Sequence, residues 1–505
     1  MNVALRRLEP AAAAAGGALQ TLAFVHTAWW PLPLLTLALL VWRLNSSTPR
    51  RAALLGWCYG TAWLCAGVWW LFISMHRYGG LPAPLAAAAV FALSAALSLY
   101  LAAACAGYAR WRRGTATDTL LFPALWLLAE LARGVIFTGF PWVASGYAQV
   151  DAPLATLAPW LGVYGMGAVG AWLAAAVAHA LARQGWKAAA PVACLGVVLA
   201  SLGALGAAVT GHTQPAGDMS VALLQTNVKQ DEKFAADRMP EMLAWVAREL
   251  LAAQAALVVT PETAVPLLPD QLDHYAPGYW AALLAHFSWP ERAALVGVPK
   301  GDFDTGYTNS VAGLSAAPEY RYAKHHLVPF GEFIPNGFHW FTRMMNIPLG
   351  DFLRGVDNPP SFQVGRQRVA PNICYEDLFG EELARRFADA ATAPTVFANI
   401  SNIGWFGDTV AIPQHLNISR LRALEFERPM LRATNTGATA VIDHHGRVTA
   451  SLVPYTRGVL TAVVQGRQGL TPFAWWASRA GLWPLWGAAL SVVAVAVVLK
   501  RRACV

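Results

Sequence analysis

The chain contains eight long apolar stretches with almost no charged residues, and these constrain its fold more than any other feature. They lie at residues 10–26, 28–44, 53–75, 83–108, 118–136, 155–182, 188–210 and 480–499. A helix needs roughly 20 residues to cross the hydrocarbon core of a bilayer. Only 13% of the 505 residues are charged, where ordinary soluble proteins have roughly 25%. The sequence therefore predicts a multi-pass α-helical membrane domain of about eight spans, and it argues against a purely soluble or disordered chain.

The first stretch has a second interpretation as a secretory signal peptide, because Arg6 and Arg7 precede its apolar run. Ala-rich sequence continues beyond the run without a clear cleavage site, which favours a span that is retained in the protein. The first two stretches are also short and interrupted by Pro or Gly, so they match a full span less well than the other six.

Basic residues in the short loops predict the orientation of the spans. If the N-terminus is cytoplasmic, the same side receives Arg6, Arg7, Arg50, Arg51, Arg110, Arg112, Arg113, Arg183, Lys187, Lys500, Arg501 and Arg502. The opposite loops carry little more than Arg77. We therefore expect both termini in the cytoplasm and residues 211–475 on the opposite side of the membrane, which is the periplasm if the cell is Gram-negative. No Lys/Arg run of the nucleic-acid-binding type is present, so no nucleic-acid partner is expected.

From about residue 217 the pattern changes to short β-type runs that alternate with amphipathic helical patterns, which is typical of an α/β domain. Strands are predicted at 220–228, 255–262, 293–300, 368–376, 395–402 and 438–446, and helices at 239–255, 380–390 and 413–427. We accordingly predict membrane helices 1–7 in residues 1–210, a soluble domain in residues 211–475, and the last span with a cytoplasmic tail in residues 476–505.

Few ionisable residues lie inside the predicted spans. Glu130 and Arg133 are three residues apart in the fifth span, close enough to form an ion pair. Either a structural pair or a contact with lipid headgroups would explain them. A transporter with a periplasmic sensor domain usually carries more such groups along its substrate path, so this class of protein is a weaker alternative.

Chemically capable side chains follow several of the predicted strands. Glu262 closes one strand, Cys374 and Glu376 close another, and a loop supplies Lys324 and Glu332. Each residue alone is more often a surface charge or a small core residue than a catalytic group. Cys374, however, is the only Cys in the predicted periplasmic domain, so it has no disulfide partner there and could be a free reactive thiol.

A thiol attacks as its thiolate, and a partly buried carboxylate can act as the base that removes its proton. A nearby ammonium group can stabilise the negative charge that develops on the substrate. Glu262, Lys324 and Cys374 at the ends of neighbouring strands would supply base, oxyanion stabiliser and nucleophile. The sequence therefore predicts an acyl-transfer site that needs no metal or organic cofactor, and it contains neither an HExxH nor a CxxC arrangement in this domain.

Three motifs resemble the signature blocks of the nitrilase/carbon-nitrogen hydrolase superfamily: TPET around Glu262, KHHLVPFGE from Lys324 to Glu332, and NICYED around Cys374. The membrane part narrows the match. GWCYGTAW (56–63), the ELARG and TGFPW stretch (130–142) and SNIGWFGD (401–408) resemble the apolipoprotein N-acyltransferase family. This resemblance covers nearly the whole chain.

The resemblance implies an αββα sandwich, inserted before the last span of a membrane bundle, and an acyltransferase that completes bacterial lipoprotein maturation. Such enzymes move the sn-1 acyl chain of a phospholipid, typically phosphatidylethanolamine, to the α-amino group of the diacylglyceryl cysteine of an apolipoprotein. By motif, Glu262 would be the general base, Lys324 the oxyanion-stabilising cation and Cys374 the nucleophile, with a Cys thioester intermediate and ping-pong kinetics. We expect a monomer, since no dimerisation signal is visible.

The resemblance also implies supporting roles at the same site. Glu332 matches an additional acidic residue, and Tyr375 and Glu376 follow the nucleophile; either substrate contact or support of the pocket would explain them. Phe234 stands where the family pattern leads us to expect Trp, which keeps an aromatic surface but puts any role of an indole N–H in doubt. Trp405, in the 403–407 loop, and the 338–341 aromatic segment are predicted to gate a groove beside the membrane, although core packing would explain them equally well.

A membrane-anchored amidase of the nitrilase type, which hydrolyses small amides or nitriles, is the main alternative function. The three superfamily blocks alone would permit it. The membrane resemblance and the number of predicted spans argue against it.

Overall fold

The structure is a computed structural model that describes residues 3–115, 117–184, 196, 211–335 and 352–503. It divides into two compact units. One unit is helical and comprises residues 1–72, 83–211 and 480–505, and the other comprises residues 73–82 and 212–479. The second unit thus gathers a short segment between two apolar helices together with the whole α/β region.

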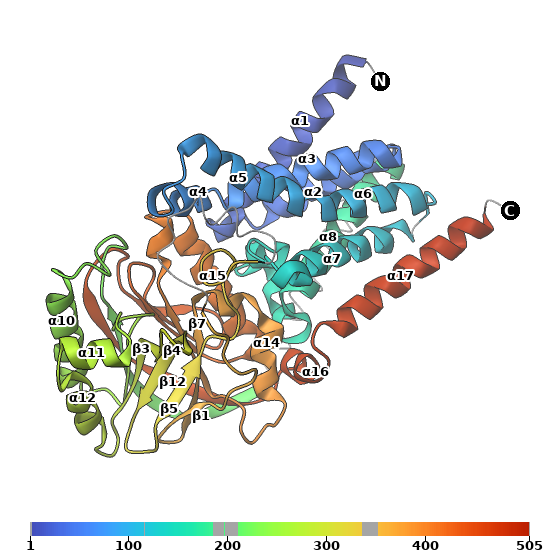
Figure 1. Cartoon of the computed structure of the whole chain (residues 1–505). Helices are drawn as coiled ribbons and strands as arrows, with labels where there is room; N and C mark the ends of the chain where they lie inside the picture. Colours follow the sequence, from blue (N-terminus) through green and yellow to red (C-terminus); the bar gives the residue numbers. More distant parts are fainter. Residues whose placement is uncertain (1–2, 116, 185–195, 197–210, 336–351, 504–505) are drawn as a thin grey trace. The chain divides into compact units, whose positions relative to one another are not determined.

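The helical unit is built from long apolar helices (Figure 1). Its main helices are α1 (Val3–Leu19), α2 (Pro31–Leu44), α3 (Pro49–Gly67), α5 (Ala83–Leu97), α6 (Leu99–Trp111), α7 (Asp118–Val135), α8 (Ala158–Gln184) and α17 (Trp483–Arg502). Pro begins or nearly begins α2, α3 and α17, where its missing N–H leaves no hydrogen bond unmade. Glu9 on α1 pairs with Arg43 and Arg51, at 2.6 and 3.1 Å, and so ties α1 to the ends of α2 and α3.

Five helical segments among the described residues are long and apolar enough to cross a membrane, at Thr27–Leu44, Ala83–Trp111, Asp118–Thr138, Pro153–Ala182 and Trp483–Arg502. The number rises to six if the broken pair Pro49–Gly67 and Leu71–Tyr78 counts as one span. The predicted first span, 10–26, coincides with the end of α1 and a 3₁₀ turn and is not among them. The predicted span at 188–210 lies outside the described residues, apart from residue 196. The total of about eight spans therefore stays a prediction.

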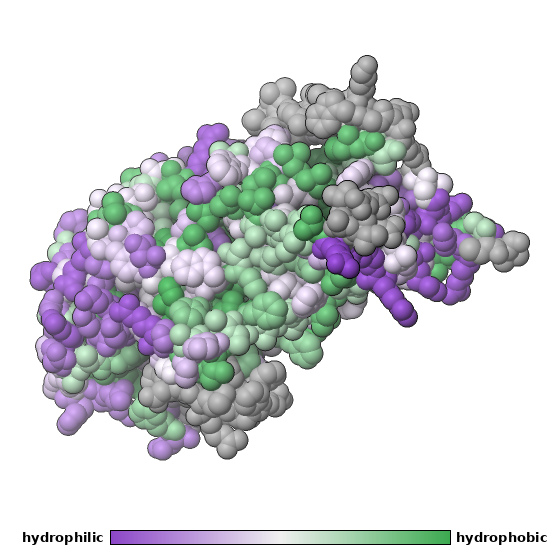
Figure 2. Space-filling model, turned by 90° about the horizontal axis from the view of Figure 1, so that it is seen from above, coloured by the Kyte–Doolittle hydropathy of each residue, from purple (hydrophilic) through white to green (hydrophobic). Residues whose placement is uncertain are grey.

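Many large apolar side chains are exposed on the surface of the helical unit. Leu39, Phe91, Leu99 and Val495 are each more than half exposed, and Figure 2 shows hydrophobic surface gathered over the apolar helices. Contiguous exposed apolar surface of this kind is unfavourable in water and marks a surface that is covered by lipid or by a partner. The helices of this unit therefore have the character of an integral membrane protein.

Glu130 and Arg133 form the intramembrane ion pair that the sequence suggested as one of two possibilities. Their N–O distance is 3.5 Å, and their side chains are 1% and 3% exposed. Glu130 also accepts hydrogen bonds from the backbone N–H and hydroxyl of Ser145, while Arg133 donates to the carbonyls of Phe140 and Trp142. The pair therefore holds the loop after α7 in place. Of the two explanations that the sequence allowed, this supports a structural ion pair rather than a contact with lipid headgroups.

The α/β unit contains two six-stranded sheets. The first has the order β12 (Gly458–Gly469), β1 (Thr213–Gln225), β2 (Leu257–Val259), β3 (Ala293–Asp302), β4 (Gly306–Leu314), β5 (Tyr320–Ala323). The second has the order β11 (Val448–Ser451), β10 (Ala440–Ile442), β9 (Met430–Thr434), β8 (Val396–Ser401), β7 (Gln367–Ile373), β6 (Phe362–Val364). The central strands β1–β2–β3 and β7–β8–β9 run parallel, and the outer strands pair antiparallel.

The two sheets pack face to face, because alternate residues of each strand point into one shared core. In β8, Ala398 and Ile400 lie in the core between the sheets, whereas Phe397 points to the opposite face. In β2, Leu257 and Val259 point inward and Val258 points outward. The sheets thus form the middle two layers of the unit.

Helices cover both outer faces of the sandwich. The first sheet is covered by α10 (Met239–Ala252), α11 (Pro269–Tyr275) and α12 (Tyr279–Phe287). The second is covered by α14 (Gly380–Ala384), α15 (Ala411–Phe426) and α16 (Pro472–Ala480). In Figure 1, α10, α11 and α12 lie together at one side of the strands. The arrangement is a four-layer helix–sheet–sheet–helix sandwich.

The segment 73–82 packs on the α/β unit, although the sequence places it between apolar helices. Arg77 lies 3.5 Å from the carboxylate of Asp231, and the ring of Tyr78 meets Trp405 edge-on, with centroids 5.7 Å apart. The predicted third span, 53–75, therefore runs past the end of its helix: α3 ends at Gly67, and residues from Ile73 onward belong to the other unit.

Candidate active site

Three strand ends bring Glu262, Lys324 and Cys374 together. Glu262 follows β2, Lys324 follows β5 directly, and Cys374 follows β7 directly. The expectation that these strands are neighbours is wrong, because β2 and β5 are separated in the first sheet and β7 belongs to the second. The site forms because face-to-face packing places the carboxyl ends of strands from both sheets at one edge of the sandwich.

The carboxylate of Glu262 is held by neutral donors at both oxygens. Asn309, on β4, donates its side-chain N–H to Oε1 at 2.7 Å. Asn402, directly after β8, donates its backbone N–H to Oε2, also at 2.7 Å. Because one donor comes from each sheet, the orientation of this carboxylate depends on the assembled sandwich.

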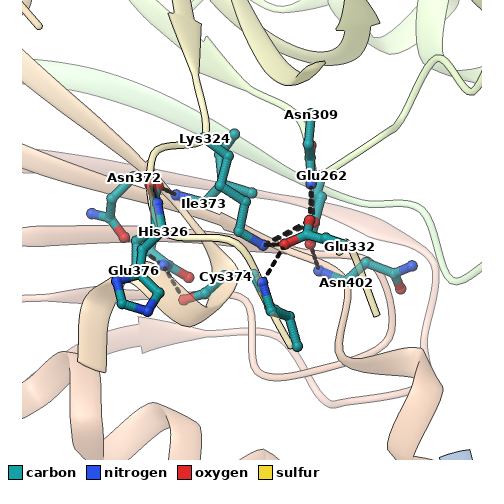
Figure 3. Close-up of polar contacts among 12 residues, drawn as sticks. Glu262, Asn309, Lys324, His326, Glu332, Asn372, Ile373, Cys374, Glu376 and Asn402 are labelled. Carbon is teal, nitrogen blue, oxygen red and sulfur yellow. Dashed lines mark hydrogen bonds and ion pairs between the residues drawn. The ribbon is translucent and has the colours of Figure 1, made fainter. Parts of the chain in front are cut away.

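Lys324 is fully buried and surrounded by acidic oxygens. Its Nζ lies 2.8 Å from Oε2 and 2.9 Å from Oε1 of Glu332, and 3.9 Å from Oε1 of Glu262. Figure 3 shows the ammonium group pointing toward these carboxylates. Burial by itself lowers the pKa of Lys324, but the carboxylates of Glu332 and Glu262 outweigh it and raise the pKa above its usual value. Lys324 therefore stays a cation.

Cys374 occupies a strained position at the turn from β7 into a 3₁₀ helix at Cys374–Leu378. Its φ is +52°, in the left-handed region, which costs an L-residue roughly 1–2 kcal/mol. The carbonyl of Cys374 accepts hydrogen bonds from Asn399 at 3.1 Å and His415 at 3.2 Å. These two bonds help to hold Cys374 in a conformation that the chain would otherwise avoid.

The pKa of the Cys374 thiol is raised. Burial is the largest cause, the negative charge of Glu262 adds to it, and the positive charge of Lys324 opposes both. Cys374 is therefore a thiol rather than a resting thiolate at neutral pH, and it needs a base before it can attack a substrate.

This raised pKa predicts the pH dependence of alkylation. In the native protein, the rate at which iodoacetamide labels Cys374 should keep rising through pH 10, with about a tenfold increase per pH unit, because each unit multiplies the thiolate fraction tenfold below the pKa. In the denatured chain the same rate should level off near pH 9. Peptide mass spectrometry at Cys374 separates it from the other five cysteines. A native plateau below pH 9 would contradict the raised pKa.

Both carboxylate oxygens of Glu376 accept hydrogen bonds from groups of the protein. Its Oε2 accepts from the hydroxyl of Tyr322 and the backbone N–H of Ile373, at 2.5 and 2.6 Å. Its Oε1 accepts from the backbone N–H groups of His325 and His326, at 2.7 and 3.1 Å. One buried carboxylate thus ties the loop that follows Lys324 to the strand that precedes Cys374.

Replacing Glu376 by Gln should destabilise the α/β unit. The amide would turn an N–H donor toward groups that already donate, and leaving buried donors unpaired costs about 3 kcal/mol. We expect a lower midpoint of thermal unfolding in detergent micelles. Glu319→Gln is the matched control, because Glu319 is 68% exposed and surface changes of this kind stay within about 0.5 kcal/mol. Equal midpoints for the two variants would contradict this role for Glu376.

The remaining predicted residues divide into two groups. Glu332 lies in the polar cluster, and Tyr375 is 5% exposed with its ring packed against Phe379 and His326. Phe234 is 45% exposed, and Trp405 packs against Tyr78 as described above. Within the described part of the chain, no polar contact links either aromatic residue to Glu262, Lys324 or Cys374. The predicted aromatic gate at 338–341 lies outside the described residues.

Several residues at the site were not predicted from the sequence. Asn309 bridges the two acidic residues, since it also donates to Oε1 of Glu332 at 2.8 Å. Lys233 donates to the backbone carbonyl of Glu262 at 2.9 Å, and burial lowers its pKa to about 8. The sequence shows only a polar Asn309 within an apolar strand and Lys233 directly before Phe234. Neither feature indicates a contact with Glu262 unless the fold is known.

The cluster combines a thiol, a carboxylate and a fixed ammonium group, which suits nucleophilic attack on an ester or amide carbonyl. Among the described residues, no group of three or more His, Cys, Asp or Glu side chains is arranged to hold a metal ion.

Two family models match the chain in tandem. Residues 16–176 match the apolipoprotein N-acyltransferase N-terminal domain, and residues 220–472 match the carbon-nitrogen hydrolase domain. The first match lies in the apolar helices, and the second covers the sandwich that carries Glu262, Lys324 and Cys374.

Curated relatives match over nearly their whole length. An apolipoprotein N-acyltransferase from Verminephrobacter eiseniae is 53% identical over 490 residues, which cover 90% of this chain and 89% of that protein. One from Ralstonia nicotianae is 46% identical, covering 100% of this chain and 96% of that protein. One from Bordetella bronchiseptica is 40% identical, covering 92% and 93% respectively. With both the helical and the hydrolase-like parts matched in one chain, the protein belongs to the apolipoprotein N-acyltransferase family.

Proposed function

We propose that this chain transfers the sn-1 acyl chain of a membrane phospholipid to the α-amino group of the diacylglyceryl cysteine at the N-terminus of an apolipoprotein. Phosphatidylethanolamine is the expected donor, and the reaction would be the last step of lipoprotein maturation. The observation that supports this most directly is the convergence of Glu262, Lys324 and Cys374 in a chain of this family.

In the first half-reaction, Cys374 is the nucleophile and Glu262 the general base. Glu262 takes the thiol proton as the sulfur attacks the ester carbonyl, whose π electrons move onto its oxygen. The tetrahedral intermediate then collapses, and the leaving alkoxide of the lysophospholipid takes the proton back from Glu262. The acyl chain remains on Cys374 as a thioester.

Lys324 stabilises the oxyanion of the tetrahedral intermediate. Its position next to Glu332 and its raised pKa support the role of a permanent cation rather than of a base. The backbone N–H of Tyr375 is the proposed second donor. Removing one donor of this kind costs about 3 kcal/mol of transition-state stabilisation in well-studied enzymes.

The second half-reaction uses the same groups in the opposite direction. Glu262 removes a proton from the ammonium group of the acceptor, and the neutral amine attacks the thioester. The amine nitrogen loses a second proton as the C–S bond breaks, and this proton returns Cys374 to its thiol form. The first proton passes from Glu262 to water. Because both halves share one acyl-enzyme, we expect ping-pong kinetics.

The membrane part would keep the enzyme in the bilayer, where both lipid substrates are located. Exposing an acyl chain to water costs about 0.8 kcal/mol per CH₂, so neither donor nor product leaves the bilayer readily.

We propose about eight spans, both termini in the cytoplasm, and residues 211–475 inserted before the last span on the periplasmic side. Alkaline phosphatase fused after residue 300 should be active, and fusions at either terminus inactive; the reverse pattern would exclude this topology.

Hydrolysis of small amides is the alternative that the hydrolase-like domain alone would allow. The match of residues 16–176 to the acyltransferase N-terminal domain favours transfer instead. Supplying an amine acceptor distinguishes the two, because a transferase forms the N-acyl product and an amidase releases free acid.

Intact-protein mass spectrometry tests the proposal directly. The purified enzyme is incubated with phosphatidylethanolamine, and Cys374 should gain the mass of one acyl chain. Hydroxylamine should remove this mass, and a diacylglyceryl-cysteine peptide should accept the chain. Folded protein that gains no acyl mass would overturn the proposal.

A further inference from the structure

A buried polar network lies behind Cys374, which we call the His415 network: Asp377, His415, Ser419 and Arg432. All four side chains are at most 1% exposed. His415 Nε2 is 3.0 Å from Asp377 Oδ1, and an Arg432 guanidinium nitrogen is 3.2 Å from Asp377 Oδ2. Ser419 hydrogen-bonds to both Asp377 and Arg432. None of these residues belongs to the proposed triad, yet the network reaches the backbone of the nucleophile.

The network determines which nitrogen of His415 carries the proton. Arg432 lies 3.1 Å from Nδ1 of His415, and a guanidinium group can only donate hydrogen bonds. Nδ1 therefore accepts, and the ring proton is on Nε2. That N–H faces the carboxylate of Asp377 and the carbonyl of Cys374, at 3.0 and 3.2 Å. Burial by itself raises the pKa of Asp377, but His415 and Arg432 lower it overall, which keeps the carboxylate charged.

The carbonyl of Cys374 and the N–H of Tyr375 are two ends of one planar peptide unit. In a trans peptide they point in opposite directions, and the chain contains no cis peptide bond among its described residues. Asn399 and His415 both donate to this carbonyl, from β8 and α15. Fixing the carbonyl toward the His415 network therefore aims the N–H of Tyr375 away from the network.

We propose that His415, oriented by Asp377 and Arg432, is a positioning residue that holds the Cys374–Tyr375 peptide unit so that its N–H faces the oxyanion of the acyl-transfer intermediate. The inference rests on the proposed function, and it assigns to the network a task in the reaction beyond packing. His415 does not touch the substrate. It acts through the one peptide plane that its hydrogen bond to the Cys374 carbonyl holds.

The test compares His415→Leu with His415→Gln in the full-length enzyme. Leu fills a similar volume but donates no hydrogen bond, whereas the amide of Gln can still donate to the Cys374 carbonyl. When a group that stabilises the transition state is displaced by about 1 Å, the rate falls about 100-fold. We expect thioester formation from phosphatidylethanolamine to slow about 10- to 100-fold in His415→Leu, with KM unchanged, and to recover most of the wild-type rate in His415→Gln. His286→Leu, on the partly exposed surface of α12, should keep the wild-type rate.

Alkylation of Cys374 by iodoacetamide distinguishes positioning from general damage. This displacement at a carbon centre forms no oxyanion, so it reports the thiolate but not the Tyr375 N–H. If the inference is correct, His415→Leu keeps the alkylation rate within about twofold while acylation falls. Parallel changes in both rates, or wild-type acylation in His415→Leu, would overturn it.

If His415→Leu does not fold, Ser419→Ala replaces it, because this change removes only one hydroxyl from the network. A smaller loss, about 3- to 10-fold, with unchanged alkylation is then expected, and equal acylation would overturn the inference. A wild-type enzyme that forms no thioester would instead refute the proposed function, so the two failures are distinguishable.

Discussion

Cys374→Ala is expected to abolish thioester formation and lower acyl transfer by roughly 10⁴-fold or more, because the covalent step loses its nucleophile. Alanine is smaller and apolar, and the Cys374 carbonyl keeps its hydrogen bonds from Asn399 and His415. The variant should therefore fold and insert normally. Acyl transfer is followed with a fluorescent phospholipid donor and a diacylglyceryl-cysteine peptide, and the acyl-enzyme by mass spectrometry.

Cys65→Ala provides the matched control. Cys65 is a partly buried free cysteine in α3, in the other unit of the chain, and its removal should leave acyl transfer unchanged. Cys374→Ser adds a second comparison, since a hydroxyl of similar size is a much weaker nucleophile at neutral pH. Wild-type turnover in folded Cys374→Ala would remove this residue from the mechanism.

Glu262→Gln is expected to slow thioester formation by roughly 10²- to 10⁴-fold, the usual contribution of a general base. The amide keeps the shape of the carboxylate and can still accept a hydrogen bond from Asn309 or Asn402. It cannot take the proton of a thiol whose pKa is raised by burial. Single-turnover acylation measured by rapid quench and mass spectrometry isolates this step from the second half-reaction.

The rate of thioester formation should also depend on pH differently in Glu262→Gln and in the wild type. Without a base, attack depends on the small fraction of thiolate that forms spontaneously, so the residual rate should increase about tenfold per pH unit below the thiol pKa. The wild-type rate should depend much less on pH over the same range. Glu249→Gln, a change of a partly exposed carboxylate on α10, should behave as the wild type. A fast Glu262→Gln variant with the wild-type pH profile would contradict the role of base.

Local patterns located five of the six central strands of the sandwich and missed β9. The predictions at 255–262 and 395–402 match β2 and β8, whose apolar residues form short buried runs between polar turns. The pattern did not reveal β12, which pairs antiparallel with β1 although more than 200 residues separate Ser220 from its partner Val463. Most residues of β12 are exposed or half-buried, with Val464, Gly466 and Arg467 buried, so the place of this strand in the sheet comes from pairing with β1 more than from burial of its own residues.

In the helical part, too, a local sequence pattern predicted only some of the structure. Apolar length predicted most of the spans, because crossing a bilayer requires a long uncharged helix. It also extended the third predicted span to residue 75, whereas α3 ends at Gly67 and residues from Ile73 onward belong to the α/β unit. Apolar length measures how much chain can be buried, and it does not distinguish burial in lipid from burial against protein.

The sequence by itself determined the class of the protein and the three blocks that carry Glu262, Lys324 and Cys374, because apolar length and motif identity are properties of contiguous residues. Only the tertiary structure decided that these blocks come from two sheets, that Asn309 bridges Glu262 and Glu332, and that His415 holds the Cys374 carbonyl. Those contacts join residues between 23 and 47 positions apart in the chain. They exist because two sheets bury their apolar faces against each other, which no local pattern of residues specifies.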